Sequence, residues 1–206
     1  MFVRTTTTTA TQAGIDRGIS YVRDEVVPTL MTIDGYVGMS ALVDRATGRC
    51  ITASAWESPS AMRASESEVQ PLRQRFVSAS ESLDATVEEW EVALMHRLHA
   101  AGENACARVS WLQGDPFAIE DSIDAFRAIL PSVEKLHGFA SASLLVDRAT
   151  ARAASTVVYD TMADMARSRP QASDIRARVA DETGTDVLEV AEFEVALAQL
   201  RVPELV

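Results

Sequence analysis

The chain has 206 residues, of which 47% are apolar and 24% are charged, and its formal net charge at pH 7 is −11. This composition excludes a disordered tail, a collagen-like rod and a disulfide-stapled miniprotein, and the length allows one large domain or two small ones with a buried core. Because the acidic charge would repel a phosphate backbone, we expect no nucleic-acid partner.

The sequence contains no recognisable metal, disulfide or membrane motif. Cys50 and Cys106 have no CxxC or other ligand spacing, which argues against a zinc site or a disulfide framework. No stretch approaches the ~18 consecutive apolar residues of a membrane span. Residues 1–10 lack the apolar core of a signal peptide. We therefore predict a cytoplasmic protein with no metal site and no membrane partner.

The first predicted elements are a strand and a long helix. Phe2–Thr9 is a run of β-branched and aromatic residues that is typical of a strand. Apolar residues spaced by three or four then predict an amphipathic helix, which ends at the stop signal Gly35. These residues are Ile15, Ile19, Val22, Val26, Leu30 and Ile33.

Two further strands, joined by the polar residues 44–49, are predicted to form a hairpin. If Asp44 pairs with Arg49, the alternation of the pleat places a defined set of side chains on one face. This set is Val37, Met39, Ala41, Val43, Cys50, Thr52, Ser54 and Trp56. Ser58 and Pro59 then suit the N-cap and first position of a second helical region.

The last strand of the first half is predicted at residues 86–98. Its alternation places four residues on one face, namely Trp90, Val92, Leu94 and His96. Glu89 and Glu91 fall on the other face, and both recur in the second half as Glu192 and Glu194. For these carboxylates we favour a structural role, such as salt bridges with arginines across a pseudo-dimer, over paired acid–base chemistry.

The chain repeats itself at an offset of 103 residues. Residues 36–49 (YVGMSALVDRATGR) match residues 139–152 (FASASLLVDRATAR), and the same offset pairs Pro28 with Pro131 without any insertion or deletion. We interpret this as a duplication that gives two domains, 1–102 and 103–206. Each half has the order β-α-β-β-α-β, so the predicted fold class is α+β, with two ferredoxin-like repeats whose uncovered sheet faces pack together.

Three segments carry a resemblance to a known family. Residues 35–38 (GYVG), the strand end Trp56-Glu57-Ser58 and the closing strand 89–94 resemble the antibiotic biosynthesis monooxygenase domain, of the dimeric α/β-barrel superfamily. In the second half, Trp-Glu-Ser has become Tyr-Asp-Thr. The resemblance implies an intramolecular dimeric α/β barrel formed by the two halves. The protein is then a monomer with an internal pseudo-dimer, or a homodimer.

By the same resemblance, the ligand site lies on the helix-facing side of the sheet. The candidate substrate-binding residues there are Thr8, Thr52, Ser54, Trp56, Trp111 and Tyr159, with Trp111 taken as the counterpart of Thr8. An aromatic ring with a few hydroxyl groups suits a flat apolar ligand. The alternative is that Trp56 is core packing and that the hydroxyls satisfy backbone groups.

His96 is the candidate proton acceptor, because the chain has few histidines. Its repeat partner is Gln199, so a catalytic role would belong to one half only. The alternative is a structural or surface histidine. His99 lies three residues further along the same strand and faces the other side, which argues against a shared metal ion.

Two functions are left open. The resemblance implies a cofactor-independent monooxygenase-like protein that oxidises a small aromatic, quinol-like or lipophilic molecule with O₂. The haem-degrading members carry a Trp and a His in the second helical region; the corresponding positions fall near Ser65 and Gln74, so we expect no haem. The alternative is a non-catalytic small-molecule binder, or a structural or interaction protein with the same barrel, since fold alone does not establish activity.

Overall fold

The computed structural model describes residues 1–200, and each half of the chain has the predicted order of elements. The first half consists of β1 (Phe2–Thr9), α1 (Gln12–Tyr21), a π-helical segment (Val22–Val26), α2 (Val27–Leu30), β2 (Tyr36–Val43), β3 (Arg49–Trp56), α3 (Pro59–Ala64), α4 (Glu66–Ala79) and β4 (Ala85–Arg97). The second consists of β5 (Cys106–Gln113), a 3-10 turn (Pro116–Ala118), α5 (Ile119–Val133), β6 (Phe139–Asp147), β7 (Arg152–Tyr159), α6 (Met162–Arg167), α7 (Arg169–Thr183) and β8 (Asp186–Leu200).

The hydrogen-bonded order of the strands is β1-β3-β2-β8-β5-β7-β6-β4, which closes into a barrel. The predicted fold class, an α+β fold of two ferredoxin-like repeats that form one intramolecular α/β barrel, is confirmed.

The chain packs into two compact units that exchange the ends of their last strands. The first unit contains residues 1–90 together with residues 195–200, and the second unit contains Glu91–Glu194. β4 therefore begins in the first unit and ends in the second, and β8 does the reverse. The predicted domain boundary between residues 102 and 103 concerns the sequence repeat and stays a prediction. The two packed units are a different division of the chain, because each contains the end of the other half's last strand.

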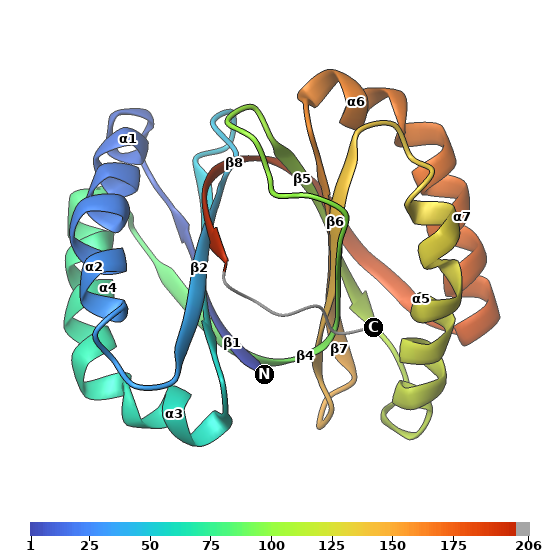
Figure 1. Cartoon of the computed structure of the whole chain (residues 1–206), viewed down its shortest axis with the longest axis horizontal. Helices are drawn as coiled ribbons and strands as arrows, with labels where there is room; N and C mark the ends of the chain where they lie inside the picture. Colours follow the sequence, from blue (N-terminus) through green and yellow to red (C-terminus); the bar gives the residue numbers. More distant parts are fainter. Residues whose placement is uncertain (201–206) are drawn as a thin grey trace. The chain divides into compact units, whose positions relative to one another are not determined.

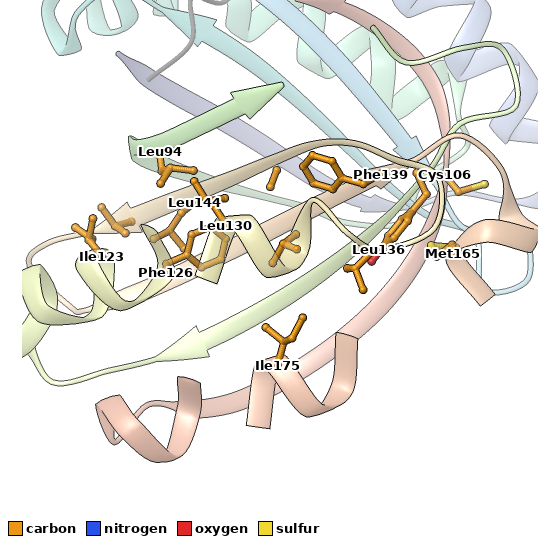
Figure 2. Packing of buried hydrophobic residues seen from close by; sticks show 14 residues of the cluster. Leu94, Cys106, Ile123, Phe126, Leu130, Leu136, Phe139, Leu144, Met165 and Ile175 are labelled. Atoms are coloured by element: carbon orange, nitrogen blue, oxygen red, sulfur yellow. The ribbon is translucent and has the colours of Figure 1, made fainter. Parts of the chain in front are cut away.

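In each unit, helices cover one face of the sheet (Figure 1). α1, α2 and α4 lie against the strands of the first unit, where Ile15, Leu30 and Trp56 are almost wholly buried. In the second unit, α5 and α7 lie against β5, β6 and β7. Figure 2 shows Phe126 of α5 turned toward Leu144 of β6, within the apolar core of that unit.

The predicted hairpin is confirmed. The amide of Asp44 donates to the carbonyl oxygen of Arg49 at 2.8 Å, and β2 pairs with β3 in the expected register from Val43↔Cys50 onward. The predicted common face holds for the residues nearest the turn. It is interrupted at the far end, where a bulge lies between Tyr36 and Gly38.

The predicted face of β4 is wrong. Its pairing with β6 shifts register between Val92 and Leu94, and a one-residue bulge moves the following side chains to the opposite face. Leu94 lies in the core beneath α5. The Nε1 atom of Trp90 instead donates to Oγ1 of Thr5 at 3.0 Å, on the sheet face away from the helices.

The expectation of a repeat without insertion is also wrong. Phe2 pairs with Trp56, and Cys106 pairs with Tyr159. Trp56 and Tyr159 are 103 residues apart, whereas Phe2 and Cys106 are 104 apart. The first strands and the helices after them are therefore equivalent at an offset of 104.

The extra residue of the first half lies in its first helix. Val26 corresponds to Leu130 at the offset of 104, and Pro28 corresponds to Pro131 at 103, which makes Val27 the additional residue. It directly follows the π-helical segment Val22–Val26, and a π-bulge is how a helix absorbs one inserted residue without turning its apolar face away from the core. α5, which lacks the insertion, is α-helical throughout.

Candidate functional site

A cavity of about 100 Å³ lies between the sheet and the helices of the second unit. We call it the second-unit cavity. Its wall is mostly apolar and includes Phe126, Leu144 and Val179. It also contains eight polar side chains with a hydroxyl or guanidinium group: Arg108, Ser110, Ser122, Ser155, Tyr159, Arg176, Thr183 and Thr185. Its volume is several times what one water molecule needs.

The corresponding space in the first unit contains smaller volumes, of about 10 and 40 Å³. Phe76 lines both of them. Its repeat counterpart in the second unit is Val179, and the counterpart of Val69 is Ala172. Val179 and Ala172 both line the second-unit cavity. This cavity is therefore larger than the first-unit volumes at positions where a smaller side chain replaces a larger one.

Arg108 lines the second-unit cavity and is only 4% exposed. Its Nε and Nη2 atoms donate to Oε1 of Glu192 at 3.1 and 2.7 Å. Nη1 donates to the hydroxyl of Tyr159 at 3.1 Å and to Oγ of Ser168 at 3.3 Å, and Nη2 donates to the carbonyl oxygen of Met165 at 2.8 Å. Since the Tyr159 oxygen accepts from arginine, its proton is left to be donated elsewhere.

The first unit repeats this buried arginine as Arg4. Its Nε and Nη2 atoms donate to Oε1 of Glu89 at 3.0 and 2.7 Å, and Nη2 also donates to the carbonyl oxygen of Met62 at 3.1 Å. Glu89 and Glu192 thus form salt bridges with arginine, as expected for a structural role, and each does so within its own unit.

The sequence reasoning missed both buried arginines. A constant offset of 103 pairs Arg4 with Ala107, so the repetition of the arginine is hidden. An alignment that allowed one inserted residue would have paired Arg4 with Arg108. Arg73 and Arg176 do match at 103, but nothing in their sequence context indicates that both line a cavity.

Three predicted site residues lie on the expected side of their sheets. Tyr159 lines the second-unit cavity, and Thr52 and Ser54 line the volume of about 40 Å³ in the first unit. Trp56 is fully buried beside them without lining either first-unit volume. Its Nε1 atom donates to Oγ of Ser54 at 3.1 Å, and its ring meets that of Tyr36 edge-on at 5.8 Å.

Thr8 and Trp111 are not counterparts, because the first strands are offset by 104. Thr8 corresponds to Leu112, which lines the second-unit cavity. Trp111 lies between the cavity-lining residues Ser110 and Leu112, so its side chain is on the opposite face of the sheet. There its ring meets Phe193 edge-on at 6.4 Å. Thr8 is buried, and its hydroxyl has no hydrogen-bond partner among residues 1–200.

His96 lies near the end of α5 and is not one of the residues that line the second-unit cavity. Its Nε2 atom is 2.7 Å from Oε1 of Glu134, and its ring stacks on Phe139 with a centroid separation of 6.1 Å. Its role as a proton acceptor stays a prediction. Its neighbour His99 contacts a different carboxylate, Asp160, at 2.7 Å.

Within the described residues, no group of three or more His, Cys, Asp or Glu side chains is arranged to hold a metal ion. No helix in residues 1–200 combines the length and apolar character needed to span a membrane.

No family model matches the chain. Two curated proteins of Mycobacterium tuberculosis are similar to it over its whole length, and both are named as uncharacterized proteins. Rv2558 is 50% identical over 208 residues, which covers 100% of this chain and 88% of the relative. Rv2557 is 45% identical over 207 residues, which covers 100% and 92%.

Solved structures with the same fold also extend over almost the whole chain. A Fusobacterium nucleatum protein has a TM-score of 0.72 at 13% identity, over 97% of this chain and 94% of its own. An anthrone oxidase-like protein has a TM-score of 0.68 at 13% identity, over 99% and 94%. A haem-degrading enzyme of Listeria monocytogenes has a TM-score of 0.54 at 8% identity, over 94% and 99%. At these identities the likeness shows the fold alone.

Proposed function

We propose that this chain, which belongs to the family of the Mycobacterium tuberculosis proteins Rv2558 and Rv2557 and has the fold of antibiotic biosynthesis monooxygenases, is a cofactor-independent monooxygenase-like protein. Its substrate is a small aromatic, quinol-like or lipophilic molecule held in the second-unit cavity. The observation that carries the proposal is this apolar cavity of about 100 Å³ with a few polar groups in its wall, the usual composition of a small-molecule site.

The proposed reaction converts an activated methylene group of the substrate into a carbonyl group. A base removes one proton, and the resulting carbanion supplies the electrons that reduce O₂. One oxygen atom then forms the new C=O bond, and the other leaves as water with the two hydrogens of the methylene group. The protein orients the substrate, excludes bulk water and accepts the first proton. His96 is the predicted acceptor, and loss of turnover in His96→Ala is the result expected for that role.

The decisive experiment fills the second-unit cavity with the side chain that the first unit already uses. Val179→Phe reproduces Phe76, the residue that lines both small first-unit volumes. With a panel of anthrones and quinols and no added cofactor, the wild type is expected to consume O₂ and Val179→Phe is expected to lose this activity. Phe76→Val is the matched control in the first unit and should retain it. Unchanged O₂ uptake in a folded Val179→Phe variant would overturn the proposal.

One observation favours the alternative, a binder without catalysis. His96, the predicted base, is outside the wall of the second-unit cavity and is already in contact with Glu134. Saturable binding of the same compounds that Val179→Phe abolishes, with no O₂ uptake by the wild type, is the result expected for this alternative.

A further inference from the structure

The two units neutralise their buried arginines differently. In the first unit, Glu66 lies between two guanidinium groups: its Oε2 atom is 2.7 Å from Nη1 of Arg4, and its Oε1 atom is 2.5 Å from Nη2 of Arg73. With Glu89 on the other side of Arg4, this cluster has two cations and two anions, so its formal charge is zero.

In the second unit, the carboxylate between the two arginines is missing. Position 169, the repeat counterpart of Glu66, is an arginine. Arg169 turns to Glu192 instead, with Nε and Nη2 donating to its two carboxylate oxygens at 3.1 and 2.6 Å. Glu192 therefore serves both Arg108 and Arg169, and the counterpart of Arg73, Arg176, receives no carboxylate. Arg108 and Arg169 thus share one carboxylate, and Arg176 has none within the described part of the chain.

The replacement of the carboxylate by Arg169 leaves Arg176 without a counter-ion from the described residues. Among residues 1–200 it has no hydrogen bond or ion pair, yet it lines the second-unit cavity beside Arg108 and Tyr159. Its pKa is lowered, first because burial disfavours the charged form and then because Arg108 repels it. A partly buried guanidinium without an anion is costly, and an anionic ligand would relieve that cost.

We infer that the second-unit cavity selects an anionic ligand, a molecule with an apolar body and one carboxylate or phenolate oxygen group that Arg176 binds. The apolar wall formed by residues such as Phe126 and Val179 takes the body. Tyr159 lines the same cavity and, because its oxygen accepts from Arg108, has its proton available for the ligand's oxygen. Arg108 has its donors occupied by protein groups and contributes through its charge. The inference deepens the proposed function and rests on it, because it concerns the same cavity.

The test compares ligands that differ only in charge. Binding of 1-naphthoate and 1-naphthamide, and of benzoate and benzamide as a smaller pair, is measured by titration calorimetry at low salt. The wild type is expected to prefer each carboxylate over its amide by about 10-fold or more, the usual effect of one hydrogen bond to a charged group. Arg176→Gln should remove that preference by weakening carboxylate binding while leaving amide binding nearly unchanged.

Two further variants separate local charge from general effects. Arg169→Glu restores the carboxylate that the first unit has and should also abolish the preference for the anion. Arg73→Gln, the matched change in the first unit, should leave the preference intact. Thermal unfolding of each variant confirms that it is folded; Arg176→Gln removes no hydrogen bond to residues 1–200 and should unfold close to the wild-type temperature.

The outcomes also distinguish this inference from the proposed function. Equal binding of acid and amide by the wild type, both blocked by Val179→Phe, overturns the inference and leaves the substrate cavity standing. A preference for the acid that survives in Arg176→Gln likewise overturns it. Preference for the acid without any O₂ uptake supports the inference and counts against the oxygenase. Absence of binding by all four compounds overturns the inference.

Discussion

Glu192 is the counter-charge of two arginines in the second unit, because it forms ion pairs with both Arg108 and Arg169. We predict that Glu192→Gln destabilises the fold by about 3 kcal/mol, since it leaves the buried Arg108 without a counter-charge. Glu89→Gln is the matched control and should cost less, because Arg4 keeps its contact with Glu66. Urea denaturation of the two variants measures the difference, and equal losses would contradict it.

The same residue predicts a pH dependence. Hydrogen bonds from Arg169 and, more weakly, from Arg108 lower the pKa of Glu192 below its usual 4.5. A lowered folded-state pKa means that this carboxylate stabilises the fold fully above its unfolded-state pKa, and that the contribution is lost as the pH falls through the folded-state value. The stability gap between wild type and Glu192→Gln should therefore be constant near neutrality and should shrink in acid, as followed by denaturation at a series of pH values.

The two cysteines are predicted to be inert in the folded protein. Cys50 and Cys106 are 5% and 3% exposed, and burial raises the pKa of the Cys50 thiol to about 11. Since the thiolate is the reactive form, a thiol reagent at pH 8 should label neither cysteine in the native state and both in denaturant. Rapid labelling of the native protein would show that these strand ends open readily.

At the scale of elements, the π-helical segment identifies a place where the chain tolerates a change of length. We predict that deletion of Val27 leaves a folded protein whose first helix is α-helical throughout, as α5 is. The loss of one buried valine should cost about 2 kcal/mol. Circular dichroism and thermal unfolding provide the measurement.

A deletion elsewhere should not be tolerated in the same way. Removal of Gln70 from α4 would turn the rest of that helix by about 100°, the rotation per residue of an α-helix, and would move Leu72 and Phe76 away from the core. This control variant should unfold or aggregate. If both deletions were equally harmful, the interpretation of Val27 as an inserted residue would be wrong.

At the scale of the whole molecule, neither half of the sequence contains a complete unit. Residues 195–200 belong to the first unit, and residues 91–97 belong to the second. We predict that fragments 1–102 and 103–206, each expressed alone, aggregate or self-associate through unpaired strands. When they are co-expressed, they should form a one-to-one complex on size-exclusion chromatography with light scattering. Two stable monomeric fragments would contradict this prediction.

Much of the fold could be predicted because its signals are local or repeated. Two ferredoxin-like repeats are predicted by the apolar spacing from Ile15 to Ile33, the hairpin at Asp44 and the match between residues 36–49 and 139–152. Because each repeat leaves one face of its sheet uncovered, the duplication also predicts that the two sheets pack together. Side-chain alternation predicted that Thr52 and Ser54 share a face, and the family resemblance predicted that the ligand site lies on the helix-facing side with Thr52, Ser54 and Tyr159, which is where these residues lie.

The candidate site depended on what the tertiary structure alone decided. The inserted residue at Val27 shifts the correspondence between the first strands of the two halves by one position, so Arg108, and not Trp111, lies on the helix-facing side of β5. The bulge in β4 separates the face of Trp90 from that of Leu94. A shift of one residue hardly changes the composition of a segment or the spacing of its apolar residues, so it is difficult to detect in the sequence. In a strand, where side chains alternate between two faces, the same shift moves every side chain to the opposite face. The sequence therefore determined the architecture, whereas packing decided that Arg108, Arg176 and Tyr159 meet in one cavity, because their positions in the chain carry no sign of that proximity.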